Sequence, residues 1–100
     1  MRNLDEIEQA LKDAEATMNE TDMLAVQYAL VKISNEGFKI QNMKDEELEN
    51  YVLYGCNTVN EGNAEPEYEH EDFYEKEADK EKVTNFIKLQ REFMWVREMT

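Results

Sequence analysis

The sequence predicts a single domain, residues 1–100, that is mostly or all α and forms a small bundle of about four helices. Apolar residues recur at steps of three and four in four stretches, and residues typical of turns separate these stretches. Hydrophobic residues make up 41% of the chain and aromatic residues 10%, which suffices for the modest core of a domain this size.

The first two helices are expected over residues 3–19 and 22–36. Asn3 suits an N-cap, and Thr21 is a candidate cap for the second helix after a polar break. Because of that break, two helices are favoured over one uninterrupted helix. Gly37 suits the position just beyond the C-terminus of the second helix, where a left-handed backbone is common.

Residues 38–43 alternate apolar and polar, but one such run cannot build a sheet. We interpret it as an extended connector that places Phe38, Ile40 and Met43 in the core. A third helix is expected over residues 44–59, where Gly55 either admits a close helix neighbour or marks a kink. The fourth helix should be established by Asp79. Its heptad-like stripe comprises Val83, Phe86, Ile87, Gln90, Phe93, Met94 and Arg97.

The formal net charge of −13 limits the classes of partner. Such a chain repels nucleic-acid phosphates and anionic membranes and attracts basic proteins. No apolar run is long enough for a membrane span, and the N-terminus lacks the apolar region of a secretory signal. The single cysteine, Cys56, cannot form an internal disulfide, which fits a reducing compartment. We therefore expect a cytoplasmic protein that binds neither nucleic acid nor membrane directly.

The negative charge is concentrated in residues 61–81, which we call the acidic segment. It holds ten carboxylates against two lysines, a formal charge of −8, and three aromatic side chains lie among the acids. Crowded carboxylates repel one another, and a partner rich in Lys and Arg would relieve that repulsion. The predicted partner-binding residues are Glu65, Glu67, Tyr68, Glu69, Glu71, Asp72, Phe73, Tyr74, Glu75 and Asp79.

The spacing of the acids suggests what they imitate. On a helix, carboxylates at i and i+4 lie about 5–6 Å apart, close to the roughly 7 Å between phosphates along one DNA strand. Glu67, Glu71, Glu75 and Asp79 would form one such row. The predicted function is therefore inhibition of a basic, nucleic-acid-processing protein, such as a nuclease, by a surface that mimics DNA.

Catalytic and metal-binding patterns are sparse, so no enzymatic activity and no cofactor are expected. The lone histidine, His70, forms one Glu-x-x-His pair with Glu67, whereas a di-iron bundle needs two. The EF-hand-like spacing over residues 57–68 places apolar or aromatic residues where oxygen ligands are required. Cys56 lies on an apolar stripe and is interpreted as a small core residue.

Two alternatives stay open. Glu46-x-x-Glu49 and Glu69-x-x-Asp72 resemble the magnesium motifs of all-α nucleotide pyrophosphohydrolases, which gather carboxylates around hard cations. The other alternative is a structural or regulatory helical module whose apolar stripe pairs with a partner helix or with a second copy as a homodimer. Tyr54 and Trp95 fit their stripes less well and are candidates for such an interface.

The stretch Glu67-Tyr68-Glu69-His70-Glu71-Asp72-Phe73-Tyr74-Glu75 resembles acidic-aromatic stretches of phage-encoded anti-CRISPR proteins, DNA mimics that inhibit a CRISPR nuclease. The resemblance covers about ten residues and implies a small phage protein that blocks the DNA-binding surface of a host nuclease. Small acidic helical immunity proteins, which neutralise basic nuclease toxins, would use the same physics.

Overall fold

The computed structural model describes residues 2–60 and 77–99. It contains four α-helices, α1 (Leu4–Ala16), α2 (Glu20–Asn35), α3 (Asp45–Asn60) and α4 (Lys80–Met99), and the short 3-10 helix η1 (Ile40–Asn42). The described residues contain no strand. The predicted all-α bundle of four helices is therefore confirmed.

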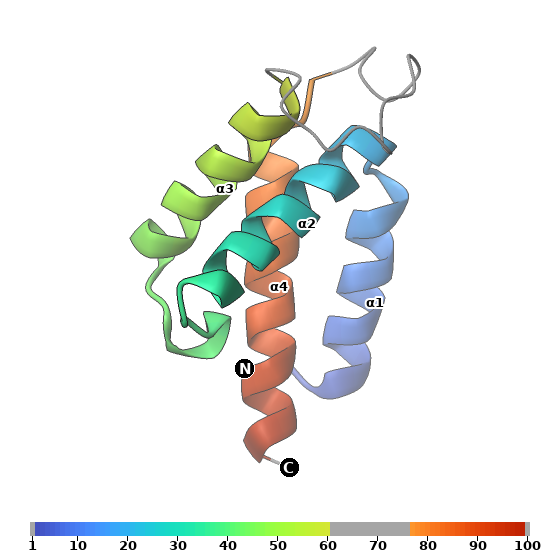
Figure 1. Ribbon diagram of the computed structural model, residues 1–100. Helices are drawn as coiled ribbons and strands as arrows, with labels where there is room; N and C mark the ends of the chain where they lie inside the picture. Colours follow the sequence, from blue (N-terminus) through green and yellow to red (C-terminus); the bar gives the residue numbers. More distant parts are fainter. Residues whose placement is uncertain (1, 61–76, 100) are drawn as a thin grey trace.

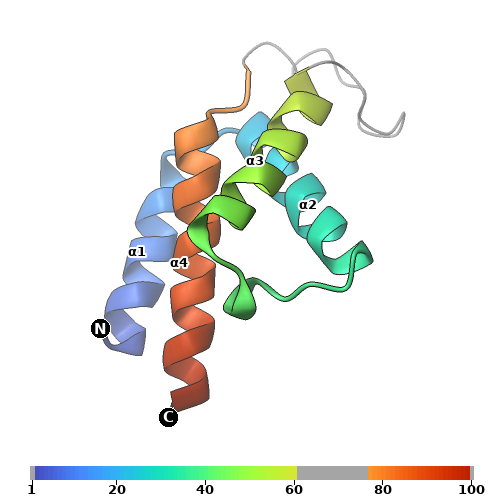
Figure 2. The same cartoon turned by 90° about the vertical axis from the view of Figure 1, so that its left-hand side faces the viewer.

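The helices form one bundle in which α1 and α4 lie side by side and α2 packs on α3 (Figures 1 and 2). Both α3 and α2 also contact α4. The core lies between these helices, and its side chains include Ile7, Val52, Val83 and Ile87, all fully buried. Among the described helices, none combines the length and the apolar character needed to cross a membrane.

The start of α1 follows the sequence prediction. The side chain of Asn3 accepts a hydrogen bond from the backbone N–H of Glu6 at 2.9 Å and satisfies one of the unpaired donors of the first turn. The helix ends at Ala16 and not at residue 19, because the chain turns at Thr17, whose hydroxyl donates to the Ala14 carbonyl.

The start of α2 differs from the prediction that Thr21 is its cap. The N-cap is Asn19, whose side chain accepts the N–H of Asp22 at 2.8 Å, while the Asp22 carboxylate accepts the N–H of Asn19 at 3.0 Å. This reciprocal capping box begins the helix at Glu20 and leaves Thr21 buried inside the first turn.

The end of α2 confirms the prediction for Gly37. This glycine has a φ of +82°, and its N–H donates to the Ser34 carbonyl while the N–H of Phe38 donates to the Ile33 carbonyl. The two bonds form a Schellman motif, which satisfies carbonyls at the end of the helix.

The connector after Gly37 was only partly predicted. Ile40 and Met43 are buried as expected, but the chain forms the 3-10 turn η1 there and is not extended throughout. The prediction that Phe38 enters the core is wrong: its side chain is 47% exposed, and its ring lies 6.3 Å from that of Tyr51. The turn that closes α2 places Phe38 at the surface.

Gly55 marks a close approach between α3 and α2. A Cβ atom added at Gly55 would lie 2.4 Å from the Ala25 carbonyl oxygen and 3.2 Å from the Ala29 Cβ. Only a residue without a side chain lets the two backbones approach this closely.

Candidate partner-binding surface

Most of the predicted partner-binding residues lie outside the described residues. Of the ten, the structure describes Asp79 alone. The other nine are Glu65, Glu67, Tyr68, Glu69, Glu71, Asp72, Phe73, Tyr74 and Glu75. Their role as a binding surface therefore stays a prediction.

Asn60, which precedes the acidic segment, and the described residues at the C-terminal end of that segment are held together at one end of the bundle. The side-chain oxygen of Asn60, the last residue of α3, accepts the N–H of Ala78 at 2.8 Å. The Asp22 carboxylate accepts the N–H of the next residue, Asp79, at 2.7 Å. Ala78 itself is buried. The C-terminus of α3 and the chain entering α4 are therefore joined where α2 begins (Figure 1).

Asp79 is exposed, and its carboxylate also has a structural role. It accepts the backbone N–H groups of Glu81 at 3.0 Å and Lys82 at 3.3 Å, which are donors of the first turn of α4. A carboxylate at this position is also favoured by the helix dipole. Sequence reasoning missed this cap, although an Asp directly before an apolar-periodic stretch is a known signal for one.

Negative charge is also present on the helices themselves. The described residues hold 17 carboxylates and ten Lys or Arg side chains, a formal charge of −7. Within residues 45–60, α3 carries four carboxylates and no cation. We call the exposed side chains Glu46, Glu47 and Glu49, together with Leu53 and Tyr54 further along the helix, the α3 face.

Two cations of α4 lie at the edge of the α3 face. Arg91, which is 7% exposed, bonds through Nη2 to the Asp45 carboxylate and through Nη1 to the Met43 carbonyl at 2.9 Å. The bond from Arg91 holds the pKa of Asp45 below its usual value. Lys88 lies 3.7 Å from Asp45 and 3.8 Å from Glu49. The start of α3 is thus tied to the middle of α4.

The two aromatic residues predicted at an interface differ in their surroundings. The Trp95 indole N–H donates to the Gln41 carbonyl at 2.8 Å, and the Arg91 guanidinium lies 4.7 Å from its ring centre. Trp95 therefore joins η1 to α4 within this chain. Tyr54 is 42% exposed on the α3 face, with the Lys32 ammonium 5.1 Å from its ring centre.

The residues considered for metal binding or nucleophilic chemistry are not gathered in the described chain. No group of three potential metal ligands occurs among the described residues, and Glu69, His70 and Asp72 lie outside them. Cys56 is buried as predicted, and burial raises the pKa of its thiol to about 11. The reactive thiolate is therefore suppressed near neutral pH.

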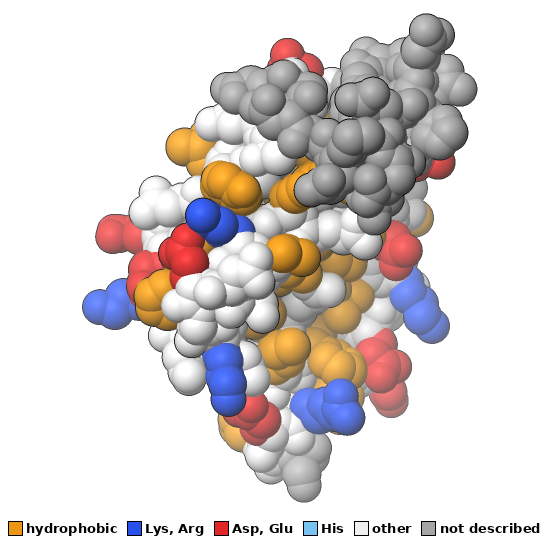
Figure 3. All heavy atoms as spheres, in the orientation of Figure 1, with side chains coloured by type: hydrophobic (Ala, Val, Ile, Leu, Met, Phe, Trp, Pro, Cys, Tyr) orange, Lys and Arg blue, Asp and Glu red, His pale blue; other side chains and the backbone are white. Residues whose placement is uncertain are grey.

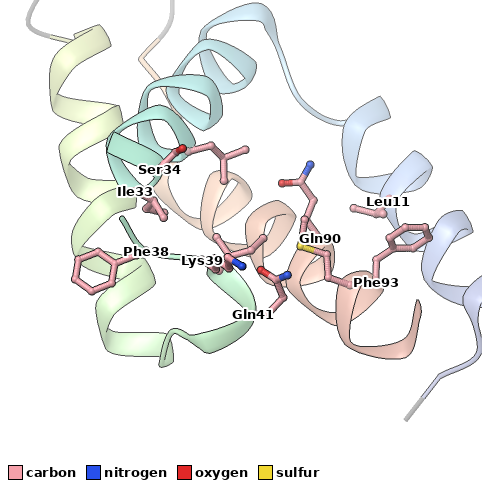
Figure 4. Close-up of a pocket in the computed structure, with 11 residues that line it drawn as sticks. Leu11, Ile33, Ser34, Phe38, Lys39, Gln41, Gln90 and Phe93 are labelled. Carbon is pink, nitrogen blue, oxygen red and sulfur yellow. The ribbon is translucent and has the colours of Figure 1, made fainter. Parts of the chain in front are cut away.

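A feature that the sequence did not reveal is an apolar groove between α1 and α2, floored by α4 (Figures 3 and 4). Its lower hollow has a volume of about 540 Å³ and is lined by Leu11, Leu30 and Phe93, among others. Phe93 and Met94 were predicted as part of a core stripe, but Phe93 is half-buried and Met94 is 38% exposed.

Comparison with known proteins assigns no family. No protein-family model matches the chain, and searches of curated proteins and of solved structures found no significant match. The class that the described residues define is a small, acidic, all-α bundle with a carboxylate-bearing helix face and an apolar groove.

Proposed function

We propose that this chain binds a basic protein surface that normally contacts nucleic-acid phosphates, and that it inhibits that protein by occupying the surface. The observation that carries the proposal is the crowding of ten carboxylates into residues 61–81. A nuclease with an exposed phosphate-binding groove is the kind of partner that fits best, as the resemblance to anti-CRISPR DNA mimics implies.

The described residues support this proposal in two ways. Asn60 and Ala78 are hydrogen bonded, so the residue before the acidic segment and the C-terminal part of the segment are held together on the bundle. The carboxylates of the α3 face belong to the helix that leads directly into that segment. A partner that contacts the segment would therefore find further negative charge on the adjoining helix.

One aromatic and one aliphatic side chain accompany the charge and would add specificity. Tyr54 and Leu53 are exposed on the α3 face at 42% and 44%. Tyrosine is enriched at the energetic centres of protein interfaces, because its ring buries a large area while its hydroxyl stays hydrogen bonded. Electrostatic attraction would then set the rate of association, and contacts of this kind would slow dissociation.

The test compares two variants with equal net charge. The segment variant combines Glu67→Gln, Glu69→Gln, Glu71→Gln and Asp72→Asn. The control combines Asp5→Asn, Glu6→Gln, Asp13→Asn and Glu98→Gln, four exposed carboxylates on α1 and the end of α4. Each is immobilised at about 50 mM salt, where screening is weak, and presented with a host lysate.

The expected result is that the wild-type chain and the control retain the same nucleic-acid-binding protein, whereas the segment variant does not. Duplex DNA should displace the retained protein, because the chain and the DNA that it mimics compete for the same surface of that protein. About 1 M salt should release it. Retention that persists at that salt, or that DNA does not reduce, would contradict the proposal.

A further inference from the structure

A second hollow extends the apolar groove along α2, from the lower hollow toward the start of that helix. Above the lower hollow lies a second one of about 390 Å³, lined by Met18, which lies between α1 and α2, and by Met23 and Gln27 of α2. Figure 3 shows hydrophobic side chains gathered in the middle of this face of the molecule. From Met23 to Ser34 the groove follows α2 for roughly 16 Å at 1.5 Å per residue, which is three turns of a docked helix.

The floor of the groove contains an unsatisfied polar atom. The side-chain oxygen of Gln90 is buried and has no hydrogen-bond partner among the described residues. In Figure 4, Gln90 extends from α4 between Leu11 on one side and Ile33 on the other. A buried acceptor without a donor is unfavourable, so a bound ligand whose donor reaches this oxygen, after the Gln90 amide turns toward the groove, would gain a hydrogen bond.

The upper part of the groove is acidic. The charged side chains that line the two hollows are Glu15 and Glu20 in the upper one and Lys39 in the lower one. Helical spacing also places Glu8 on the same side of α1 as Leu11 and Glu15. An occupant with cations beside its apolar face would therefore be favoured at the upper hollow.

We propose that this groove binds an amphipathic helix of another, basic protein. Its apolar side chains would cover Leu11, Leu30 and Phe93, a polar side chain would donate to Gln90, and Lys or Arg would face Glu15 and Glu20. A second copy of this chain is a poorer occupant, because each copy carries a charge of −13. No described residue of the acidic segment lines the groove. A helix bound there would add apolar contacts to the electrostatic contacts of the proposed function.

The test uses an 18-residue amphipathic peptide with a leucine face, one asparagine at its centre and lysines along both flanks. A matched peptide carries glutamate in place of lysine. Backbone amide shifts of the labelled protein report where each peptide binds, and a titration gives the affinity. The largest shifts should fall on Leu11, Leu30, Gln90 and Phe93, and the glutamate peptide should bind at least about tenfold more weakly.

Two variants separate the groove from general attraction to a basic peptide. Leu30→Ala should weaken binding about tenfold, as truncation of an interface anchor does. Leu53→Ala removes a side chain of the same size, exposed on the α3 face, and should change the affinity by less than about twofold. Circular dichroism checks that both variants remain folded.

Three results would overturn the proposal. One is a set of shifts confined to α3 and the acidic segment. Another is an equal loss of affinity in Leu53→Ala and Leu30→Ala. The third is a dimer, detected by sedimentation equilibrium, whose dissociation on dilution changes the backbone amide shifts of the groove residues. A second copy of the chain would then be the occupant. The segment variant described above should still bind the peptide in its groove, so failure of one proposal is distinguishable from failure of the other.

Discussion

The carboxylate of Asp22, in the first turn of α2, accepts the backbone N–H of Asp79 at 2.7 Å, directly before α4 begins. Its second oxygen accepts the N–H of Asn19 at 3.0 Å. One side chain, 1% exposed, thus caps one helix and holds the start of another. Because Asp79 in turn caps α4, the two helix starts are linked through consecutive hydrogen bonds at the end of the bundle where the acidic segment is attached.

Replacement of Asp22 by alanine should destabilise the fold by about 3 kcal/mol. The variant loses an N-cap interaction and leaves the N–H groups of Asn19 and Asp79 without their acceptor. Urea unfolding followed by circular dichroism measures the loss. Asp13→Ala, at an exposed position of α1, is the control and should stay within about 0.5 kcal/mol. Equal stability of the two variants would show that the bonds of Asp22 do not contribute.

This linkage also shows which parts of the fold were predictable from sequence. The caps at Asn3 and Gly37 depend on neighbours within a few residues, so the sequence predicts them. Thr21 and Asn19 are both competent caps, and Asn19 is the one that forms reciprocal hydrogen bonds with Asp22, three residues on. The capping box of Asn19 and Asp22 spans only four residues, so this start of α2 could have been found from the sequence, whereas the bond from Asp22 to Asp79 could not.

The binding surfaces were predictable to different degrees. Charge can be counted from sequence, so the acidic segment and the carboxylates of α3 were evident. The groove was not, because the apolar stripes of α1 and α4 predict burial wherever they occur. Whether Leu11 and Phe93 are covered depends on how far α1 and α2 diverge, and that angle is set by tertiary packing.

Replacement of Gly55 by alanine should destabilise the protein by about 2 kcal/mol, although alanine is the better helix former by about 1 kcal/mol. The added Cβ would lie 2.4 Å from a backbone carbonyl oxygen of Ala25, so α2 or α3 must move. Thermal or urea unfolding measures the change. Asn57→Ala, at an exposed position of the same helix, tests propensity alone and should be neutral or slightly stabilising. A gain in stability for Gly55→Ala would contradict the close approach.

The Asp45–Arg91 pair should make stability depend on pH in the acid range. The bond from Arg91 lowers the pKa of Asp45 in the folded state relative to 3.8, so the unfolded state binds the proton more readily. The stabilisation is therefore complete above the unfolded pKa and is lost as pH falls through the folded pKa. Asp45→Asn should be less stable than wild type at pH 7, and the difference should shrink as pH falls below 3.8, the unfolded value.

Urea midpoints at pH 7, 5, 4 and 3 test this dependence in both proteins. Glu46→Gln, a neighbouring exposed carboxylate, is the matched control and should show no such convergence. If the urea midpoints of wild type and Asp45→Asn differ by the same amount at every pH, the ionised form of Asp45 does not provide the stabilisation.

Replacement of Gln90 by methionine should raise the stability of the free protein by about 1 kcal/mol. The amide oxygen of Gln90 is buried without a partner among the described residues, and methionine has a similar length without a polar group to satisfy. Unfolding in urea measures the gain, and Gln9→Met, at an exposed position of α1, should give no comparable increase.

The same Gln90→Met variant should lose its preference for a peptide with a central asparagine over one with a central leucine. If the variant is stabilised but retains this preference, the asparagine of the bound peptide donates its hydrogen bond to another group. If the variant is destabilised, the Gln90 oxygen already accepts a hydrogen bond in the free protein.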